Sequence, residues 1–227
     1  MVETIPLFPL GTVLLPGASL PLHVFEPRYR QLTTDLVTGA VAGRSFGVVA
    51  VRPGWNATDG DVQALHPVGC SARLKEVRRL PDGRFDIVTV GDRRFRMLGV
   101  NTVAAPYLMA TVEWLPDDQA AAADARDLVP ALAHAARGAH RSYCAVAWKR
   151  AEWDAPGRDV DPALLAHLLA ADCLLPLEDR QLLLEETSCV RRLRLVRTMV
   201  VRETEILRTL RAVPVPVDQF LAPLCLN

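Results

Sequence analysis

The stretch that decides the fold is PLFPLGTVLLPG at residues 6–17, continued by LPLHVFEPRYR at residues 20–30. Its pattern predicts a strand, a turn shaped by proline and glycine, a second strand and the start of a helix. Proline fixes the backbone φ angle and has no N–H to donate to a strand ladder. We therefore expect each of the two strands to be short or to lie at the edge of a sheet.

The remainder of the first half has the pattern of a β structure, in which short apolar runs alternate with turn signals. The turn signal Pro81–Gly83 predicts a hairpin between Ser71–Leu80 and Arg84–Val90, and Gly91-Asp92 is expected to end the second strand. One helix is expected over Pro27–Gly39, because proline suits a first helical turn and glycine a helix end. Further strands are expected at Ser45–Val51, Arg94–Val100 and Tyr107–Leu115.

From Asp117 onward the apolar spacing becomes helical. An Ala-rich helix is expected over residues 118–149, with a break near Pro130 or Gly138. Three more helices are expected, beginning at Asp161-Pro162, at Pro176 and at Ser188, the last reaching about Arg211. The expected organisation is a β subdomain at residues 1–116, a helical subdomain at 117–212 and an extended tail at 213–227.

Several shorter motifs accompany the opening stretch, at Gly69–Ala72, Asp82–Phe85, Gly91–Arg96, Pro106-Tyr107 and Leu174–Leu177. Together these residues closely resemble the N-terminal, substrate-binding domain family of Lon proteases, over nearly all of residues 3–211. The resemblance implies an α+β fold, namely a PUA-like six-stranded pseudo-barrel followed by a helical bundle. It also implies a unit that recognises unfolded or tagged substrates and helps to assemble the protease.

In that family the chemistry resides in an ATPase module and a Ser-Lys peptidase module. The sequence contains no G-x-x-x-x-G-K-[ST] phosphate loop, because its only two lysines, Lys75 and Lys149, lie outside glycine-rich loops. Nothing after Arg211 has the pattern of a long coiled coil. We therefore expect a stand-alone recognition domain that is not an enzyme and uses no cofactor or metal.

Composition narrows the class of protein further. Of 227 residues, 50% are hydrophobic and 23% are charged, which is typical of a globular chain. The 26 basic and 26 acidic side chains cancel, so no net charge favours nucleic acid or an anionic membrane. The five cysteines include no C-x-x-C pair, which favours free buried thiols in the cytoplasm. The charge-free residues 4–25 contain four prolines and are not a membrane-spanning helix.

Two groups of residues are candidates for a functional site. The first would line an apolar groove for protein segments and consists of Phe8, Leu14, Leu15 and Trp114. The second belongs to the family motif and is expected to hold the fold; it consists of His23, Glu26, Pro27, Arg28, Tyr29, Arg93, Arg94 and Phe95. Within it, we expect Glu26 to pair with one of the arginines among residues 93–96, between the barrel and the helix.

Three patterns point to other functions. GRSFG at residues 43–47 matches the G-x-S-x-G elbow of hydrolases, but the expected order of helix and strand is the reverse of an elbow. His140 and Cys144 have the i, i+4 spacing of a metal-ligand pair without a second pair; otherwise they are a surface histidine and a packed cysteine. The last helix carries seven arginines against two glutamates, a candidate RNA-binding face that lacks aromatic residues to stack bases.

The function that these observations favour is a non-enzymatic module that binds exposed apolar segments of unfolded or tagged proteins. An RNA-binding module of PUA-like fold is the alternative, and a hydrolase ranks lowest. The expected partners are the substrate proteins and a protease or chaperone, with weak self-association left open. No membrane is expected among the partners, and nucleic acid is disfavoured.

Overall fold

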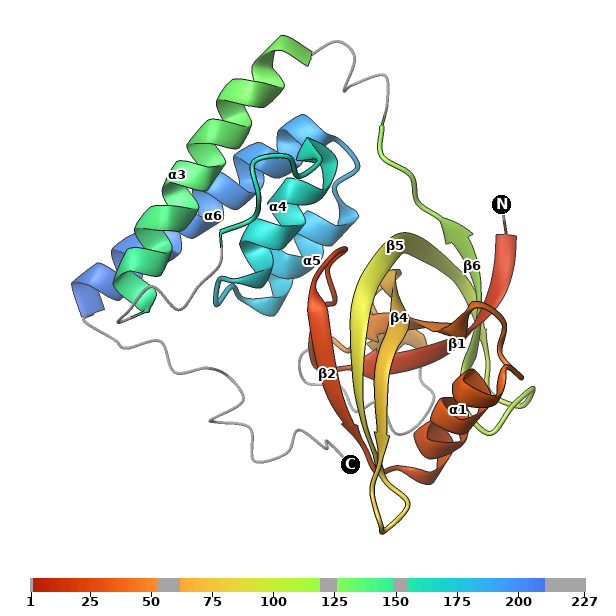
Figure 1. Ribbon diagram of the computed structural model, residues 1–227. Coiled ribbons are helices and arrows are strands. Elements are labelled where there is room, and N and C mark those ends of the chain that lie inside the picture. Colours follow the sequence, from red (N-terminus) through yellow and green to blue (C-terminus); the bar gives the residue numbers. More distant parts are fainter. Residues whose placement is uncertain (1, 53–61, 119–125, 149–154, 211–227) are drawn as a thin grey trace. The chain divides into compact units, whose positions relative to one another are not determined.

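The computed structural model describes residues 2–52, 62–118, 126–148 and 155–210 (Figure 1). The chain divides into two compact units, the first ending at Leu115 and the second beginning at Pro116. The extended tail expected at residues 213–227 lies outside the described residues.

The first unit is a six-stranded sheet that closes on itself. Its strands are β1 (Val2–Leu10), β2 (Ser19–Val24), β3 (Ser45–Ala50), β4 (Val68–Arg79), β5 (Phe85–Asn101) and β6 (Met109–Trp114). The order is β2-β5-β4-β3-β1-β6, and an additional pairing of β5 with β6 closes the barrel. Strands β1 and β3 are parallel, and the other pairs are antiparallel. Single helical turns lie at Ala42–Arg44 and Val62–Ala64.

Strand β1 differs from the expectation of a short or edge strand. It runs for 9 residues between two neighbours, although it contains Pro6 and Pro9. Its first part, Val2–Pro6, pairs with β6, and its second part, Leu7–Leu10, pairs with β3. Because each part has a paired neighbour on one side only, a proline whose missing N–H points to the other side interrupts neither ladder. The expectation was right for β2, which has 6 residues and lies at the edge.

Strand β5 is one strand of 17 residues, where we had expected two strands separated at Gly91-Asp92. A Cβ atom on Gly91 would lie 2.2 Å from the carbonyl oxygen of Leu15, so glycine is needed for the close approach of another segment. The register against β4 shifts between Cys70 and Ala72, beside the same glycine. Glycine therefore marks a close approach and an irregularity within β5, and not the end of the strand.

Two local signals place the turn and the helix of this unit correctly. The β4–β5 hairpin turns at Pro81–Gly83, and Gly83 has a φ of 81°. Ile87 and Thr89, which lie on the same face of β5, are both buried. Helix α1 (Pro27–Thr38) begins at the predicted proline, and Gly39 ends it in the left-handed conformation with a φ of 83°.

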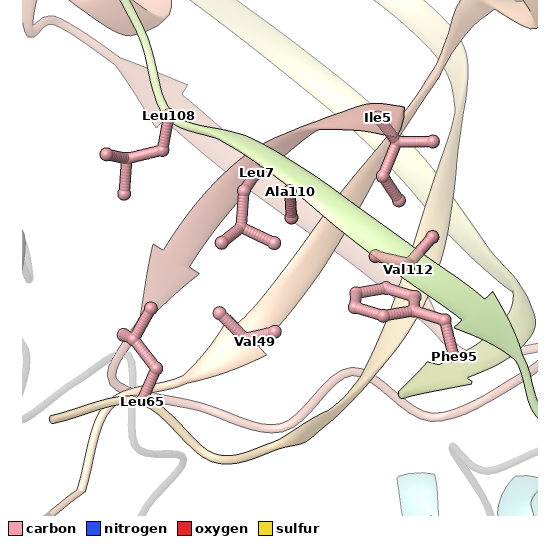
Figure 2. Close-up of a cluster of buried hydrophobic side chains, with 8 residues drawn as sticks. All are labelled: Ile5, Leu7, Val49, Leu65, Phe95, Leu108, Ala110 and Val112. Atoms are coloured by element: carbon pink, nitrogen blue, oxygen red, sulfur yellow. The ribbon is translucent and has the colours of Figure 1, made fainter. Parts of the chain in front are cut away.

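A cluster of buried apolar side chains fills the barrel (Figure 2). Phe95 is fully buried in this cluster, and two glycines leave room for its ring. Cβ atoms on Gly47 and Gly69 would lie 2.8 and 2.5 Å from Phe95 Cζ. Full burial of one such large side chain stabilises a fold by about 1.5–3 kcal/mol. The cluster consists of Ile5, Leu7, Val49, Leu65, Phe95, Leu108, Ala110 and Val112.

The second unit is helical, with α3 and α6 packed side by side and running in the same direction (Figure 1). The helix α4 begins at the predicted position, where the Asp161 side chain accepts a hydrogen bond from the Ala163 N–H at 2.9 Å and caps the helix. The helical stretch expected over residues 118–149 changes beside Pro130, where a separate helical turn ends at Leu128 and α3 begins at Val129; α3 runs through Gly138 without a break. After a helical turn at Arg126–Leu128, the helices are α3 (Val129–Ala147), α4 (Pro162–Ala171), α5 (Leu177–Glu185) and α6 (Cys189–Leu210).

The architecture is therefore the expected α+β arrangement, a six-stranded pseudo-barrel followed in the chain by helices.

Candidate functional site

Tyr29, in the first turn of α1, contacts two other candidate residues. The Phe8 ring stacks on it with centroids 3.7 Å apart and planes inclined by 8°. The Arg28 guanidinium carbon lies 4.7 Å from the same centroid, and Arg28 Nε donates to Glu26 Oε2 at 2.8 Å. Burial raises the pKa of the Tyr29 hydroxyl to about 12. The predicted pair between Glu26 and an arginine of residues 93–96 is wrong, because Glu26 pairs with an arginine of its own segment.

Trp114, the last residue of β6, is fixed by three contacts. Its Nε1 donates to Glu3 Oε2 at 2.9 Å. The Arg93 guanidinium carbon lies 4.0 Å from the centroid of the indole ring. The Phe95 ring meets the indole edge to face, with centroids 6.3 Å apart. The indole is partly exposed, so Trp114 combines a defined orientation with accessible aromatic surface.

The other three groove candidates are buried in this structure. The exposed fractions of these residues are 9% for Phe8, 3% for Leu14 and 1% for Leu15. They contribute to the apolar core, and in this conformation they offer a peptide almost no surface. Among the motif residues, Arg94 is also buried, whereas Arg93 is exposed. Phe8, Leu14 and Leu15 are therefore core residues in this structure, and Trp114 is the candidate that retains accessible surface.

A charged network on β2, β4 and β5 was missed by the sequence analysis. Asp86 accepts a hydrogen bond from His23 Nδ1 at 2.7 Å and a second from Arg78. The other ring nitrogen of His23 lies 3.3 Å from Arg84 Nη1. The hydrogen bonds from His23 and Arg78 hold the pKa of the Asp86 carboxyl below its ordinary value of 3.8. The strand register that aligns these residues, with Asp86 opposite both His23 and Arg78, was the signal that could have found them.

A comparison of the chain with known protein families identifies its family. The family model for the ATP-dependent protease La (LON) substrate-binding domain matches residues 4–202. The chain belongs to this family. The resemblance that we inferred from the opening motif is thus confirmed.

Two curated relatives of this Lon-family chain are Lon proteases. Lon protease 1 of Thermus thermophilus is 29% identical over 203 residues, and the Lon protease of Roseiflexus castenholzii is 31% identical over 209 residues. These matches cover 88% and 90% of this chain but 25% of each relative. The chain thus spans about a quarter of the length of the curated relatives it matches.

Two solved structures share the fold of this Lon-family chain. The Lon N-terminal domain protein from Xanthomonas campestris has a TM-score of 0.55 at 24% identity, covering 93% of this chain and 99% of that one. The N-terminal domain of the Mycobacterium avium complex Lon protease has a TM-score of 0.65 at 20% identity, covering 87% and 98%. At these identities the likeness concerns the fold alone.

The hydrolase elbow does not form in this Lon-family chain. Ser45 has the extended angles φ −135° and ψ 153° and begins β3. The positive φ angles belong to the two residues before it, Gly43 at 72° and Arg44 at 50°. An elbow requires its nucleophile on the sharp turn between a strand and a following helix. The order seen here, a turn followed by a strand, does not present Ser45 as a nucleophile.

His140 is buried, so the expectation of a surface histidine is wrong. Its Nε2 lies 3.1 Å from Asp172 Oδ2. The Cys144 sulfur is 3.6 and 3.9 Å from the two ring nitrogens, so it lies on the lone-pair axis of neither. Burial raises the pKa of the Cys144 thiol to about 11. The pair therefore fits neither shared metal ligands nor a nucleophile with its base, and the described ranges contain no metal-binding group of three such side chains.

The arginines of α6 do not share one cationic face. Arg192 is completely buried. Arg202 pairs with Asp179 of α5 and with Glu203, and Arg208 pairs with Glu205 at 2.7 Å. Acidic neighbours thus neutralise part of the charge that suggested an RNA-binding face. None of the helices within the described ranges is both long and apolar enough to cross a membrane.

Proposed function

We propose that this chain is a non-enzymatic recognition module that binds exposed apolar segments of unfolded or tagged proteins. The observation that carries the proposal is the match to the Lon substrate-binding domain over residues 4–202, which reaches across both units. The geometry at Ser45 and at the His140–Cys144 pair supports the absence of nucleophilic catalysis at these sites.

Because the barrel interior is packed with side chains, client segments are expected to bind at the surface of the first unit and not in a deep pocket. The Phe95 ring fills the space beside Gly47 and Gly69. Apolar contact area is instead available on the outside of the first unit, at Trp114 and at the exposed side chains Val2, Val37, Leu98 and Val103. A shallow surface accepts many clients with little sequence preference, and its affinity is modest because ordering a flexible peptide costs free energy.

The partners in this proposal are the client proteins and a protease or chaperone that receives them. A single weak site releases its clients readily. Weak self-association of the chain would raise the overall affinity for long clients that reach two sites at once.

Fluorescence anisotropy with a panel of labelled peptides from unfolded proteins, at low and at high salt, tests the proposal. We expect dissociation constants of about 1 μM or weaker that vary little across the panel. They should also change little with salt, since apolar contacts do not release counterions. Binding to none of the peptides, or nanomolar binding to a single one, contradicts the proposal.

Two further assays separate the alternatives. Tight binding of labelled RNA that weakens steeply with salt would favour the RNA-binding module. Hydrolysis of ATP or casein by the purified chain, abolished by a point substitution, would contradict the non-enzymatic assignment.

A further inference from the structure

Strand β2 is the one strand within the described ranges that has a neighbour on a single side. It pairs with β5 from Ser19 to Val24, and its other edge faces no described strand. An unpaired strand edge presents a row of backbone N–H and carbonyl groups that another strand can bind.

Two hydrogen bonds establish which backbone groups of β2 face β5. The Gly91 N–H donates to the Ala18 carbonyl at 2.9 Å, and the Thr89 hydroxyl donates to the Leu20 carbonyl at 3.0 Å. Backbone groups alternate in direction along an antiparallel strand. Every second residue from Ala18 onward therefore faces β5, and the residues between them face the free edge.

The residues that face the free edge are Ser19, Pro21 and His23. Proline is suited to a position that faces the free edge, because the N–H that it lacks would point away from β5. No backbone hydrogen bond joins these three residues to any other described segment. The edge therefore offers the N–H groups of Ser19 and His23 and all three carbonyl oxygens to a further strand.

The side chains of β2 differ between its two faces. Leu20 and Leu22 lie on one face and are half-buried, whereas Pro21 and His23 lie on the other face and are exposed. An added strand would place alternate side chains beside these two faces. Apolar side chains would pack next to Leu20 and Leu22, and polar ones would lie beside His23.

We propose that unfolded client proteins bind by adding an extended segment, antiparallel, to the free edge of β2. This inference rests on the proposed function and specifies its mode and substrate class: about five residues of extended chain with apolar side chains at every second position. Main-chain hydrogen bonds supply affinity without sequence preference, which suits a module that must accept many clients. Antiparallel addition is the more stable of the two directions per residue.

Pro21 argues for a client strand over a second copy of this chain. If β2 paired with β2 of another molecule about a two-fold axis, both prolines would lack a donor, and two hydrogen bonds would be lost in every register that includes them. A client strand without proline loses one. Proline on an edge strand is also a device that limits self-association.

Three peptides test the mode of binding with the full chain. The probe is fluorescein-labelled Lys-Val-Thr-Val-Thr-Val-Thr-Lys amide, measured by anisotropy. In antiparallel addition with valines beside Leu20 and Leu22, the threonine N–H groups face β2 and the valine N–H groups face solvent. N-methylation of the three threonines should weaken binding at least tenfold, since three hydrogen bonds are lost. N-methylation of the three valines is the matched control and should change binding less than threefold.

The outcomes separate this inference from the proposed function. Equal binding of all three peptides is consistent with the proposed binding of apolar segments and overturns strand addition. Loss of binding only on valine methylation overturns antiparallel addition with the valines beside Leu20 and Leu22. Binding of none of the peptides contradicts the proposed function and this inference together.

Amide hydrogen exchange gives a second readout that needs no variant protein. The unmodified peptide should slow exchange at the Ser19 and His23 amides at least tenfold, with no change at Leu20 and Leu22. Slow exchange at Ser19 and His23 without peptide, together with a dimer in sedimentation, would show that a second copy already occupies the edge and would overturn the proposal.

Discussion

Arg192 of α6 and Asp117 form a two-pronged ion pair, with Nη1 to Oδ1 at 2.9 Å and Nη2 to Oδ2 at 2.6 Å. The same guanidinium donates to the carbonyl oxygens of Ala163, at the start of α4, and of Glu186, just after α5. The arginine side chain is completely buried. One side chain thus joins four segments of the second unit.

Replacing the acidic partner of this pair tests its contribution to stability. Asp117→Ala leaves a buried guanidinium without its carboxylate, and we expect it to lower the free energy of unfolding by about 3 kcal/mol. Urea unfolding followed by circular dichroism measures the change. Glu205→Ala is the matched control, because it removes an exposed ion pair with Arg208 and should cost at most about 1 kcal/mol. Equal losses for the two variants would contradict this role of Arg192.

Two glycines of β5 allow a second matched comparison. Gly91→Ala places a Cβ atom 2.2 Å from the Leu15 carbonyl oxygen, whereas a Cβ atom on Gly99 meets nothing within 4 Å. We expect Gly91→Ala to lower the free energy of unfolding by about 3 kcal/mol or more, because two backbones must separate. Gly99→Ala should be neutral or stabilise by up to about 1 kcal/mol. Thermal melts of both variants measure these changes. A native melting temperature for Gly91→Ala would contradict the close approach of Gly91 to the Leu15 carbonyl.

Glu26→Ala distinguishes a structural carboxylate from a binding one. The Glu26–Arg28 pair is partly exposed, so we expect a loss of up to about 1 kcal/mol and unchanged binding of client peptides. Thermal melts and peptide anisotropy on the same preparation measure the two quantities. Arg28→Ala is the companion variant, and it should cost more because it also removes the contact with the Tyr29 ring. An unchanged melting temperature with lost binding would make Glu26 a functional residue.

The network around Asp86 predicts a specific dependence on pH. A carboxyl whose pKa is lower in the folded state stabilises the fold above its unfolded pKa, and that contribution is lost as the pH falls through the folded value. For Asp86 the loss is therefore expected below 3.8. His23→Ala removes the larger cause of the shift and should raise the pKa of Asp86 towards 3.8.

Carboxyl ¹³C shifts recorded over about pH 2 to 6 measure this pKa directly. Arg73→Ala is the control, because Arg73 lies 4.0 Å from Asp92 and is not a partner of Asp86. If the pKa of Asp86 is identical in the His23→Ala and parent chains, the hydrogen bond from His23 does not lower it.

Local signals predicted the helix and turn positions well. Pro27 with Gly39, Pro81–Gly83 and Asp161-Pro162 each act within a few residues, so their effect does not depend on what packs against them. Glycine was harder to interpret, because Gly91 serves a contact with Leu15, 76 positions earlier in the chain, and not a turn. Periodicity alone could not distinguish a strand end from a close approach.

The sequence by itself determined the helices, the hairpin, the class of fold and the family, since these follow from short-range backbone preferences and from a long, specific motif. Only the tertiary structure decided which side chains are accessible and which charges meet. Leu15 could equally have lined a groove, and Arg192 could have faced solvent with its neighbours on α6. Burial and ion pairing depend on segments distant in the chain. Leu15 therefore became core, Arg192 met Asp117, and no strand within the described ranges covers the outer edge of β2.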